Sequence, residues 1–285
     1  LVLSGNRQAM AYMQAIGSLQ SMSPPLQAAF PFLDLKNGEQ WSVKASWKLR
    51  IPNCSILDLL SAFKLAWAPK DLTVAEALNT SRPIFRKLWE PLCISILNTA
   101  PEEAAASLLW TVFKESFGRG AQACKPCIAQ QGLSKSLVDP ALTLLRQHGS
   151  NVRFKERLKS INFKDGRAVT LIFGHNQISL RPNDTVIIAL PILATGALLP
   201  GLSCPNQHRS IVNAHFVLPR TITDLNFIGL VGGVSQWLFV REDIASVTVS
   251  AADQLAKKTN EEIAKTIWPE VLLALKLDNE PLPVY

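Results

Sequence analysis

Apolar side chains recur every three or four residues through most of the first 133 residues, which is the spacing of one helix face. The runs with this spacing are residues 6–16, 55–66 and 84–97. Pro91 falls inside the last run, and because proline lacks an N–H we expect it to break that helix. One hairpin interrupts the helices, since short β-prone runs flank Asn37-Gly38, a dipeptide that favours a tight turn.

Two further helices are indicated by their start signals. Thr73 and Glu76 have the spacing of a capping box, so a helix is expected to begin near Val74. The next helix is expected to begin at Pro101, because proline is favoured at the first helical position. The acidic pair at residues 102–103 then lies in its first turn, and we interpret it as a complement to the helix dipole rather than as a catalytic pair.

The apolar pattern becomes strand-like between residues 149 and 191, after a helix expected over residues 134–147. Three short β-prone runs follow that helix: residues 152–154, 158–163 and 168–173. Asp165-Gly166 predicts a tight turn between the last two runs. A β-branched run over residues 185–190 is typical of a strand buried on both faces. We therefore expect a β-meander and a central strand.

The last third of the chain predicts an antiparallel sheet followed by a long helix. The strand-like runs are residues 211–218, 225–230, 236–240 and 246–250, and the helix is expected over residues 253–273. Three glycines lie between these runs, at positions 229, 232 and 233, and we interpret them as a bend or bulge beside strands. Together with the helices upstream, this pattern predicts a mixed α/β fold of the α+β kind.

The charge balance argues against nucleic acid as a partner. The 29 basic and 22 acidic residues give a net charge of +7, and no run of five or more like charges occurs. One local pattern differs: basic residues alternate with other residues over positions 153–159, which would give a strand one basic face. That face suits either a solvated edge strand or contact with a phosphate or an anionic membrane surface.

The five cysteines are scattered and odd in number, so a disulfide framework is not expected and a reducing compartment fits better. Cys124 and Cys127 have C-x-x-C spacing, but no second pair or nearby histidine completes a metal site, and we expect no metal. Residues 185–202 are uncharged, yet prolines and glycines interrupt them, which favours a strand followed by a short helix over a membrane span.

Four stretches together resemble one family. They are the pattern of residues 149–191 that ends in D.VI.A.P, the segment LWEPLCISILNTAPEEAAASLL (residues 88–109), the opening LSGN (residues 3–6) and QWLF (residues 236–239). The chain resembles the squalene-associated FAD-dependent desaturases, now called hydroxysqualene dehydroxylases, within the flavin amine oxidase and phytoene desaturase superfamily. The resemblance runs in order along essentially the whole chain.

The resemblance implies the central part of an FAD-linked, amine-oxidase-like fold. Residues 134–202 would form part of an FAD-binding domain, made of a helix, a β-meander and a buried strand. Residues 1–133 would form a mostly helical part of a substrate domain, and residues 203–285 its antiparallel sheet and helix. A family member begins with a G-x-G-x-x-G turn, which is not found here, so we expect an internal fragment that by itself binds FAD weakly or not at all.

The implied activity is replacement of the hydroxyl of hydroxysqualene by hydrogen to give squalene, with FAD as cofactor and a long-chain isoprenoid as substrate. The implied cofactor-binding positions are Ser4, Gly5, Leu158, Ala189 and Pro191, although Ser4 and Gly5 equally suit an ordinary helix start. The resemblance implies that Trp237 faces the substrate cavity, and Trp89 could line a site for a long hydrocarbon in the apolar helical block. Both residues equally suit ordinary packing, Trp237 in the sheet and Trp89 in the core.

No catalytic residue is identified, because the four histidines are scattered. Two other readings stay open on the same scaffold: a carotenoid desaturase or amine oxidase, and a lipid-binding domain without catalysis. An isoprenoid substrate and a positive net charge favour a cytoplasmic protein with peripheral contact at the inner membrane.

Overall fold

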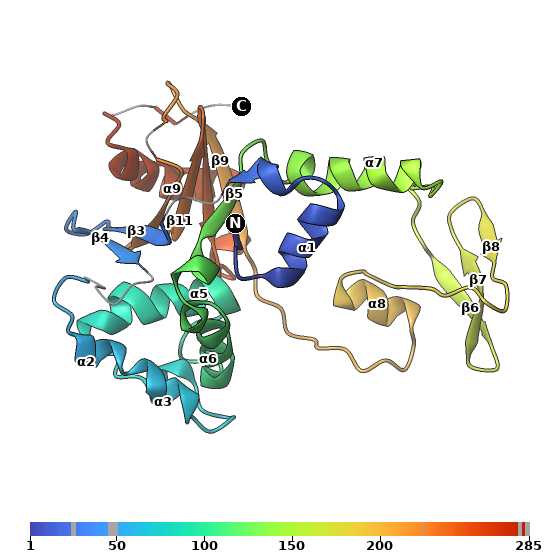
Figure 1. Cartoon of the computed structure of the whole chain (residues 1–285), viewed down its shortest axis with the longest axis horizontal. Helices are drawn as coiled ribbons and strands as arrows, with labels where there is room; N and C mark the ends of the chain where they lie inside the picture. The colour runs from blue at the N-terminus through green and yellow to red at the C-terminus, as the bar shows by residue number, and fades with distance from the viewer. Residues whose placement is uncertain (24–26, 45–50, 224, 279–280, 283–285) are drawn as a thin grey trace. The chain divides into compact units, whose positions relative to one another are not determined.

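The computed structural model describes residues 1–23, 27–44, 51–223, 225–278 and 281–282. The chain forms two compact units. Unit 1 contains Leu1–Pro140 and Arg209–Tyr285, and unit 2 contains Ala141–His208. Unit 1 carries a large sheet and most of the helices, whereas unit 2 carries most of α7 (Asp139–Gln147), a β-meander and the short helix α8 (Ile192–Leu198) (Figure 1).

Among the described residues, six strands form the main sheet of unit 1, in the order β4-β3-β10-β11-β12-β9. Their bounds are β3 (Ala29–Asp34), β4 (Gln40–Lys44), β9 (Val212–Val217), β10 (Phe227–Val231), β11 (Trp237–Arg241) and β12 (Ile244–Val249). β3 and β10 are parallel and the other neighbouring pairs are antiparallel. The expected C-terminal strands are thus confirmed. The N-terminal hairpin β3–β4 belongs to the same sheet, because β3 pairs with β10.

The turn between β3 and β4 forms as expected. Gly38 lies in the left-handed region at φ 74°, which glycine adopts without a steric penalty, and its N–H donates to the carbonyl of Asp34 at 2.8 Å. The side chain of Asn37 accepts from the N–H of Glu39 at 2.9 Å. The expectation for residues beyond Lys44 falls outside the described part of the chain.

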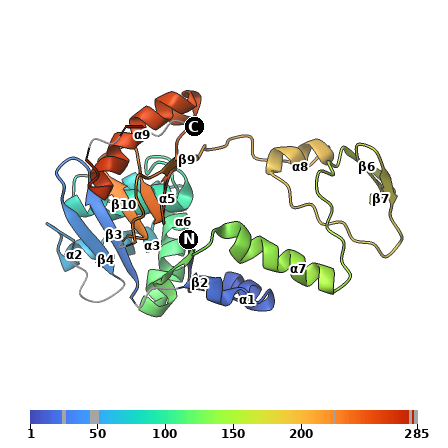
Figure 2. The same cartoon turned by 90° about the horizontal axis from the view of Figure 1, so that it is seen from above.

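The two faces of the main sheet differ in composition because side chains alternate along each strand. One face is aliphatic and packs against α9 (Asn260–Leu275), whose Ile267 and Val271 are fully buried beside Leu238 and Val247. Figure 2 shows α9 lying along the sheet. The opposite face carries most of the aromatic side chains and packs against the helices of the first half of the chain.

Those helices are α2 (Ile56–Leu59), α3 (Ala62–Ala66), α4 (Val74–Ala77), α5 (Glu90–Leu97) and α6 (Ala106–Glu115). A separate small cluster holds α1 (Arg7–Ala15), whose Met13 packs with Met22 and Cys127, and α7 lies mostly in unit 2. The capping box at the start of α4 is confirmed: the Thr73 hydroxyl accepts from the N–H of Glu76 at 3.2 Å, and the Glu76 carboxylate accepts from the N–H of Thr73 at 2.9 Å. A three-stranded sheet joins β1 (Val2–Leu3), β5 (Pro126–Ala129) and β2 (Met22–Ser23).

Two helix predictions were wrong at their boundaries. Pro91 does not break its helix, because a π-helical turn at Phe85–Trp89 leads directly into α5 and places the proline in the first turn, where its missing N–H costs least. The next helix begins at Ala106 rather than at Pro101. Residues 101–103 form a turn, and the N–H of Val74 donates to the carbonyl of Ala104 at 2.8 Å. The acidic pair at residues 102–103 therefore does not lie in the first turn of a helix, and its interpretation as a complement to a helix dipole was wrong.

Two other helices are shorter than expected. The run over residues 55–66 splits into α2 and α3 at Ser61, whose hydroxyl donates to the carbonyl of Asp58 at 2.5 Å and so competes with helix continuation. The helix expected from residue 253 begins at Asn260, because Thr259 and Glu262 form a second capping box that fixes the start of α9.

Unit 2 contains β6 (Ser160–Lys164), β7 (Arg167–Ile172), β8 (Gln177–Ser179) and α8 (Ile192–Leu198). The turn between β6 and β7 is confirmed, with Asp165 at φ 49° and Gly166 at φ 75°, both in the left-handed region that this tight turn requires. The short helix after Pro191 is also confirmed.

Two strand predictions in unit 2 were wrong. Residues 152–154 form no strand, and Lys155 adopts φ 61°, so the alternation of basic residues does not produce a basic strand face. Residues 185–190 also form no strand: Ile187 is 87% exposed, and among the described residues no strand pairs with this segment. A strand without a neighbour leaves its backbone groups unpaired, so the β-branched composition alone does not suffice.

Within the described part of the chain, no helix is both long enough and apolar enough to cross a membrane.

Candidate functional site

The aromatic face of the main sheet forms one wall of the candidate site. Phe227 on β10 and Phe239 on β11 are directly opposite each other, with their rings stacked at 6.0 Å between centroids. Trp237 lies two residues before Phe239 on the same face, and its ring is 6.1 Å from that of Phe227. Alternation along β11 thus presents two aromatic side chains and then Arg241 on one side of the sheet.

A cavity of about 660 Å³ lies against this wall, within unit 1, and we call it the sheet cavity. Its apolar lining comes from the sheet and from the segment around β5: Leu1, Pro126, Ile128, Ala129, Leu133, Ile222, Phe227, Phe239 and Val240. Its polar lining includes Gln130, Thr223, Asn226, Arg241, Glu242 and Ser246. The volume falls in the range of about 300–1,000 Å³ typical of small-molecule sites.

Gly132 brings the β5 segment close to the sheet. A Cβ on this residue would lie 3.4 Å from an Nη atom of Arg241, and its φ of 92° is one that other residues rarely adopt. The contact with Arg241 would be an ordinary van der Waals contact, so it is the backbone conformation that requires glycine here.

The polar end of the sheet cavity is held by cross-strand hydrogen bonds. Ser246 on β12 is paired with His215 on β9, and the Ser246 hydroxyl lies 2.9 Å from Nδ1 of the histidine. Further along the same strands, Thr248 donates to the side chain of Asn213 at 2.8 Å. The cavity thus combines an aromatic wall with an end that offers a hydroxyl and a guanidinium.

Ser4 and Gly5 lie next to β1, beside the β5 segment that lines the cavity. The Ser4 hydroxyl donates to the carbonyl of Gln122 at 2.5 Å and accepts from the N–H of Lys125 at 3.1 Å. A Cβ on Gly5 would lie 2.8 Å from the Cβ and carbonyl oxygen of Ala123, so this close approach requires glycine. In unit 1, both residues therefore hold the start of the chain against the β5 segment.

The two tryptophans considered as substrate-lining lie in different surroundings. Trp237 is partly buried on the aromatic face; its ring contacts Phe32 at 5.4 Å, and its Nε1 donates to the hydroxyl of Ser95 at 2.5 Å. It adjoins the pair that lines the sheet cavity but does not line that cavity itself.

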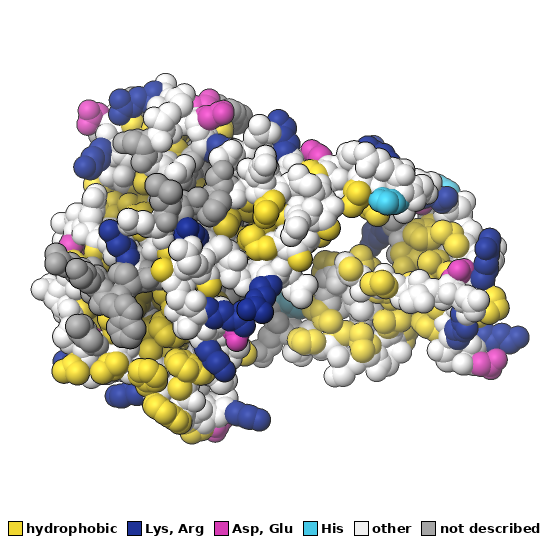
Figure 3. All heavy atoms as spheres, in the orientation of Figure 1, with side chains coloured by type: hydrophobic (Ala, Val, Ile, Leu, Met, Phe, Trp, Pro, Cys, Tyr) yellow, Lys and Arg dark blue, Asp and Glu magenta, His cyan; other side chains and the backbone are white. Residues whose placement is uncertain are grey.

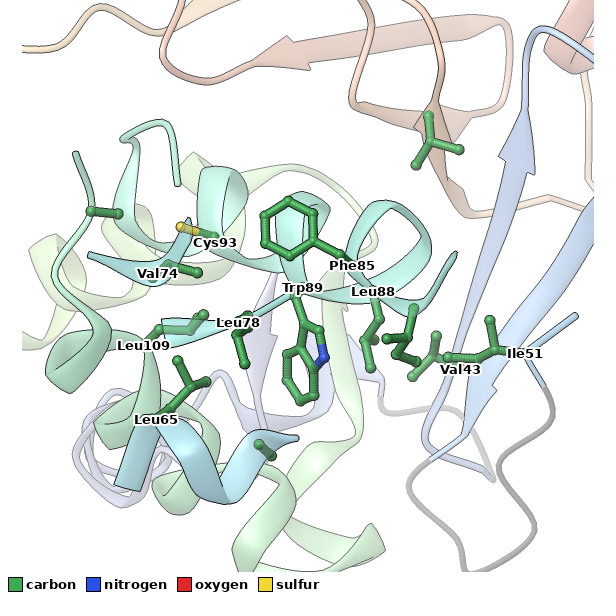
Figure 4. Packing of buried hydrophobic residues seen from close by; sticks show 14 of the residues in the cluster. Val43, Ile51, Leu65, Val74, Leu78, Phe85, Leu88, Trp89, Cys93 and Leu109 are labelled. Atoms are coloured by element: carbon green, nitrogen blue, oxygen red, sulfur yellow. The ribbon is translucent and has the colours of Figure 1, made fainter. Parts of the chain in front are cut away.

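Trp89 is 1% exposed and points into the helical core between Leu78 and Leu88 (Figure 4). Its Nε1 donates to the hydroxyl of Ser61 at 3.1 Å. It borders a second hollow of about 420 Å³ beside α2 and α3 rather than the sheet cavity. The structure therefore does not bring Trp89 and Trp237 together in one site.

Leu158 and Ala189, two of the positions considered for cofactor binding, lie in one hollow of unit 2. This hollow has a volume of about 660 Å³ and is mostly apolar, with Arg157, Lys159 and Glu156 at its border. Pro191 follows it directly at the start of α8. Apolar side chains beside two cations suit a group with an aromatic ring system and phosphates, so the residues present fit an adenine-containing flavin cofactor.

The C-x-x-C pair is buried and carries free thiols. Cys124 is fully buried and Cys127 is 2% exposed, and burial raises the pKa of the Cys124 thiol to about 11. Burial also raises the pKa of Cys127 above its ordinary value, although Lys125 opposes this effect. A thiol with a raised pKa is protonated near neutral pH and is a poor nucleophile.

Sequence reasoning missed the two phenylalanines and the arginine that line the sheet cavity. The alternation Trp237-x-Phe239-x-Arg241 in a predicted strand places these three side chains on one face, and this pattern was a usable signal. Phe227 could be found only from the register that pairs it with Phe239.

No protein-family model matches the chain. Three curated relatives are similar along nearly all of it. Hydroxysqualene dehydroxylase of Zymomonas mobilis is 35% identical and covers 95% of this chain and 68% of its own length. The proteins of the same name from Sinorhizobium fredii and Rhodopseudomonas palustris are 34% and 36% identical, and the matches cover 99% and 95% of this chain and 70% and 68% of theirs.

Solved structures of oxidases share the fold. A putative protoporphyrinogen oxidase from Exiguobacterium matches with a TM-score of 0.64 at 14% identity, over 99% of this chain and 72% of its own. A redesigned putrescine oxidase matches with the same TM-score and identity, over 97% and 70% of the two chains. At this identity the likeness concerns the fold, and it confirms the expected mixed α/β class.

Proposed function

Because the chain belongs to the hydroxysqualene dehydroxylase family, we propose that it is an FAD-dependent oxidoreductase that converts hydroxysqualene to squalene. Besides membership of the family, the sheet cavity supports this proposal, because it could bind the substrate. A hydrocarbon without polar groups along its length is held by buried area and shape, and the aromatic wall at Phe227 and Phe239 provides both.

When bound, reduced FAD would supply hydride to the carbon that loses its hydroxyl, and the proton that the reduced flavin also gives up would let the hydroxyl leave as water. In the proposal, the hollow that contains Leu158 and Ala189 binds part of this cofactor, with Arg157 and Lys159 near its phosphates. Unit 2 is thus proposed as part of the FAD-binding domain and unit 1 as the substrate domain.

The side chains of the sheet cavity have two tasks in this reaction. The aromatic wall binds the isoprenoid chain and excludes water, which would otherwise capture a cation-like carbon. At the polar end, Arg241 and Ser246 donate hydrogen bonds to the substrate hydroxyl and stabilise it as it leaves. Arginine stays charged throughout, so Arg241 contributes an electrostatic effect and not a proton.

Product analysis tests the proposal. The full-length gene product is used, because this stretch by itself is expected to bind FAD weakly or not at all. It is purified, loaded with FAD, chemically reduced and incubated with hydroxysqualene, and the extracted lipids are separated. We expect squalene in an amount that depends on protein and on reduced flavin. Flavin-loaded protein that leaves hydroxysqualene unchanged would refute the proposal, and turnover of a carotenoid precursor or an amine instead would favour the other flavoenzyme activities.

The cavity is tested separately with Phe239→Ala. Loss of one aromatic wall residue removes roughly 3 kcal/mol of packing, so we expect weaker substrate binding and a raised KM. Leu273→Ala is the matched control, because Leu273 lies on α9, is 53% exposed and is remote from the aromatic face. Equal effects of the two substitutions on KM would contradict the placement of the substrate.

A further inference from the structure

The outer surface of α2 and α3 is apolar where a surface helix is normally polar. Leu57 and Trp67 are 74% and 79% exposed, and Leu60 and Phe63 are 49% and 48% exposed. The spacing of these four residues, three or four positions apart, places them on one side of the helical segment, while Ala62 and Leu65 are buried on the other. We call the four exposed residues the α2–α3 patch.

Both sides of this segment are therefore apolar, although only one of them is covered within unit 1. A surface helix of a water-soluble protein shows an apolar stripe toward the core and polar residues outside. Contiguous exposed apolar side chains instead mark a surface that meets a partner or a membrane. Hydrophobic side chains gather over α2 and α3 at the lower left of Figure 3, with Lys and Arg side chains beside them.

Ring contacts hold the patch in place and connect it to the sheet cavity. Trp67 packs on Phe63 at 5.9 Å between ring centroids, and Phe63 packs on Trp110 of α6 at 6.2 Å. The column continues to the cavity wall through neighbouring rings 5.5–6.1 Å apart: Trp110, Phe113, Phe117, Phe30, Phe227 and Phe239. The outer rings are thus anchored in the same aromatic packing that lines the proposed substrate site.

The charges around the patch are mostly basic, with the exposed Asp71 next to Lys70 as an exception, and this balance favours an anionic lipid surface. Lys64 lies within α3, Lys70 follows Trp67 by three residues, and Lys114 is one turn beyond Trp110 on α6. All three are exposed, and none of them has an ion-pair partner among the described residues. The nearest acidic side chain on α2, Asp58, is already paired with Arg82 at 2.9 Å. Exposed Leu, Phe and Trp with unpaired lysines beside them are typical of helices that lie in the interface of an anionic bilayer.

We propose that the α2–α3 patch docks unit 1 on an anionic lipid bilayer. The docking proposal rests on the proposed function in one respect: a substrate as apolar as hydroxysqualene resides in the membrane, and this gives the protein a reason to bind there. Trp67, the most exposed member, would insert its ring at the level of the lipid headgroups, where tryptophan is favoured. The lysines would contact the anionic headgroups and orient the protein.

Vesicle flotation tests the docking without flavin or substrate. The purified protein is mixed with vesicles of phosphatidylcholine alone or with added phosphatidylglycerol, and the bound fraction is measured. We expect binding to the anionic vesicles, with at least a roughly tenfold loss in the double variant Leu57→Ser/Trp67→Ser. The control Leu19→Ser/Leu273→Ser removes two leucines of 44% and 53% exposure outside the patch and should bind as the wild type.

The charged part of the patch is tested in the same assay. Lys64→Gln and Lys114→Gln should each weaken binding to anionic vesicles roughly fivefold and leave binding to neutral vesicles unchanged. Lys258→Gln and Lys265→Gln, exposed lysines near or on α9, are the matched controls. Thermal melting of every variant separates lost docking from lost folding.

Three results would overturn the docking proposal: no vesicle binding by the wild type, equal losses in patch and control variants, or a lipid-free dimer that the patch substitutions dissociate. The last result would assign the patch to a second copy of the chain. Vesicle binding that depends on the patch, in a protein that forms no squalene, would support the docking surface and refute only the proposed function.

Discussion

Gly229→Ala tests how tightly the aromatic face of the main sheet is packed. A Cβ on this residue would lie 2.4 Å from Cε1 and 2.5 Å from Cδ1 of Phe32, well inside ordinary carbon–carbon contact. Phe32 has no free space to move into: it is 2% exposed and stacks on Trp41 at 5.6 Å. On its other side it meets Trp237 at 5.4 Å.

We expect this substitution to destabilise unit 1 by about 1–3 kcal/mol, which is the usual cost of inserting a methyl group into a packed core. The cost is steric, because the backbone of Gly229 lies outside the left-handed region and alanine can adopt it. Trp237 would have to move with Phe32, so the wall beside the sheet cavity should shift as well.

Denaturant unfolding followed by tryptophan fluorescence measures this cost. All seven tryptophans belong to the ranges that form unit 1, so the signal reports on this unit. Gly118→Ala is the matched control, since an added Cβ would meet its nearest neighbour at 3.7 Å, and its effect should stay within about 0.5 kcal/mol.

A double-mutant cycle identifies Phe32 as the cause. In the background Phe32→Leu, the smaller side chain leaves room, and the cost of Gly229→Ala should fall by at least about 1 kcal/mol. An unchanged cost in that background, or a cost no larger than that of Gly118→Ala, would refute the packing argument.

Three further predictions concern chemistry and pH. Arg241→Gln removes a donor to the leaving hydroxyl, so it should lower kcat roughly tenfold or more with little change in KM. Arg220→Gln is the control, and a rise in KM without a fall in kcat would contradict the role of Arg241. Hydrogen bonds from Thr259 lower the pKa of Glu262 below its ordinary value of 4.5, so its stabilising effect is present above that value and is lost as the pH falls through the lower folded pKa. Glu262→Gln should therefore destabilise the protein at pH 7, and this effect should shrink as the pH falls below 4.5; an undiminished loss of stability at acidic pH would be inconsistent with this. Burial raises the pKa of the Cys124 thiol to about 11, so at pH 8 this thiol should be alkylated much more slowly in the folded protein than in the unfolded protein. Mass spectrometry measures the two rates, and equal rates would argue against burial.

Local signals predicted the elements that depend on neighbouring residues. The capping box at Thr73 and Glu76, the turns at Asn37-Gly38 and Asp165-Gly166, and the four C-terminal strands all formed, because each is fixed by contacts within a few residues or by a simple alternation.

The split at Ser61 and the start of α9 at Thr259 depend on local bonds that the apolar spacing did not reveal, whereas the other failures discussed next involve partners distant in the sequence. The helix expected at Pro101 starts late because the backbone near Ala104 bonds to Val74, and a start signal carries no information about such pairing. Residues 185–190 have strand composition, but composition does not reveal whether another strand lies beside them. The parallel pairing of β3 with β10 was likewise unpredictable, because it joins residues nearly 200 positions apart.

The candidate site was predicted only in part, for the same reason. Trp237 could be placed on a sheet face from alternation alone, whereas its contacts with Phe32 and Phe227 depend on how three strands are ordered. The sheet cavity also needs the β5 segment, which approaches Arg241 through Gly132.

The most direct measurement is single-turnover analysis of the full-length gene product, loaded with flavin and reduced, with hydroxysqualene as substrate. Flavin oxidation and squalene formation are followed together. The account predicts that the two proceed at the same rate, one squalene for each flavin oxidised, and that Phe239→Ala raises the substrate concentration needed for half-maximal rate. Flavin that stays reduced while hydroxysqualene is recovered intact would contradict the assignment of this chain to reductive dehydroxylation.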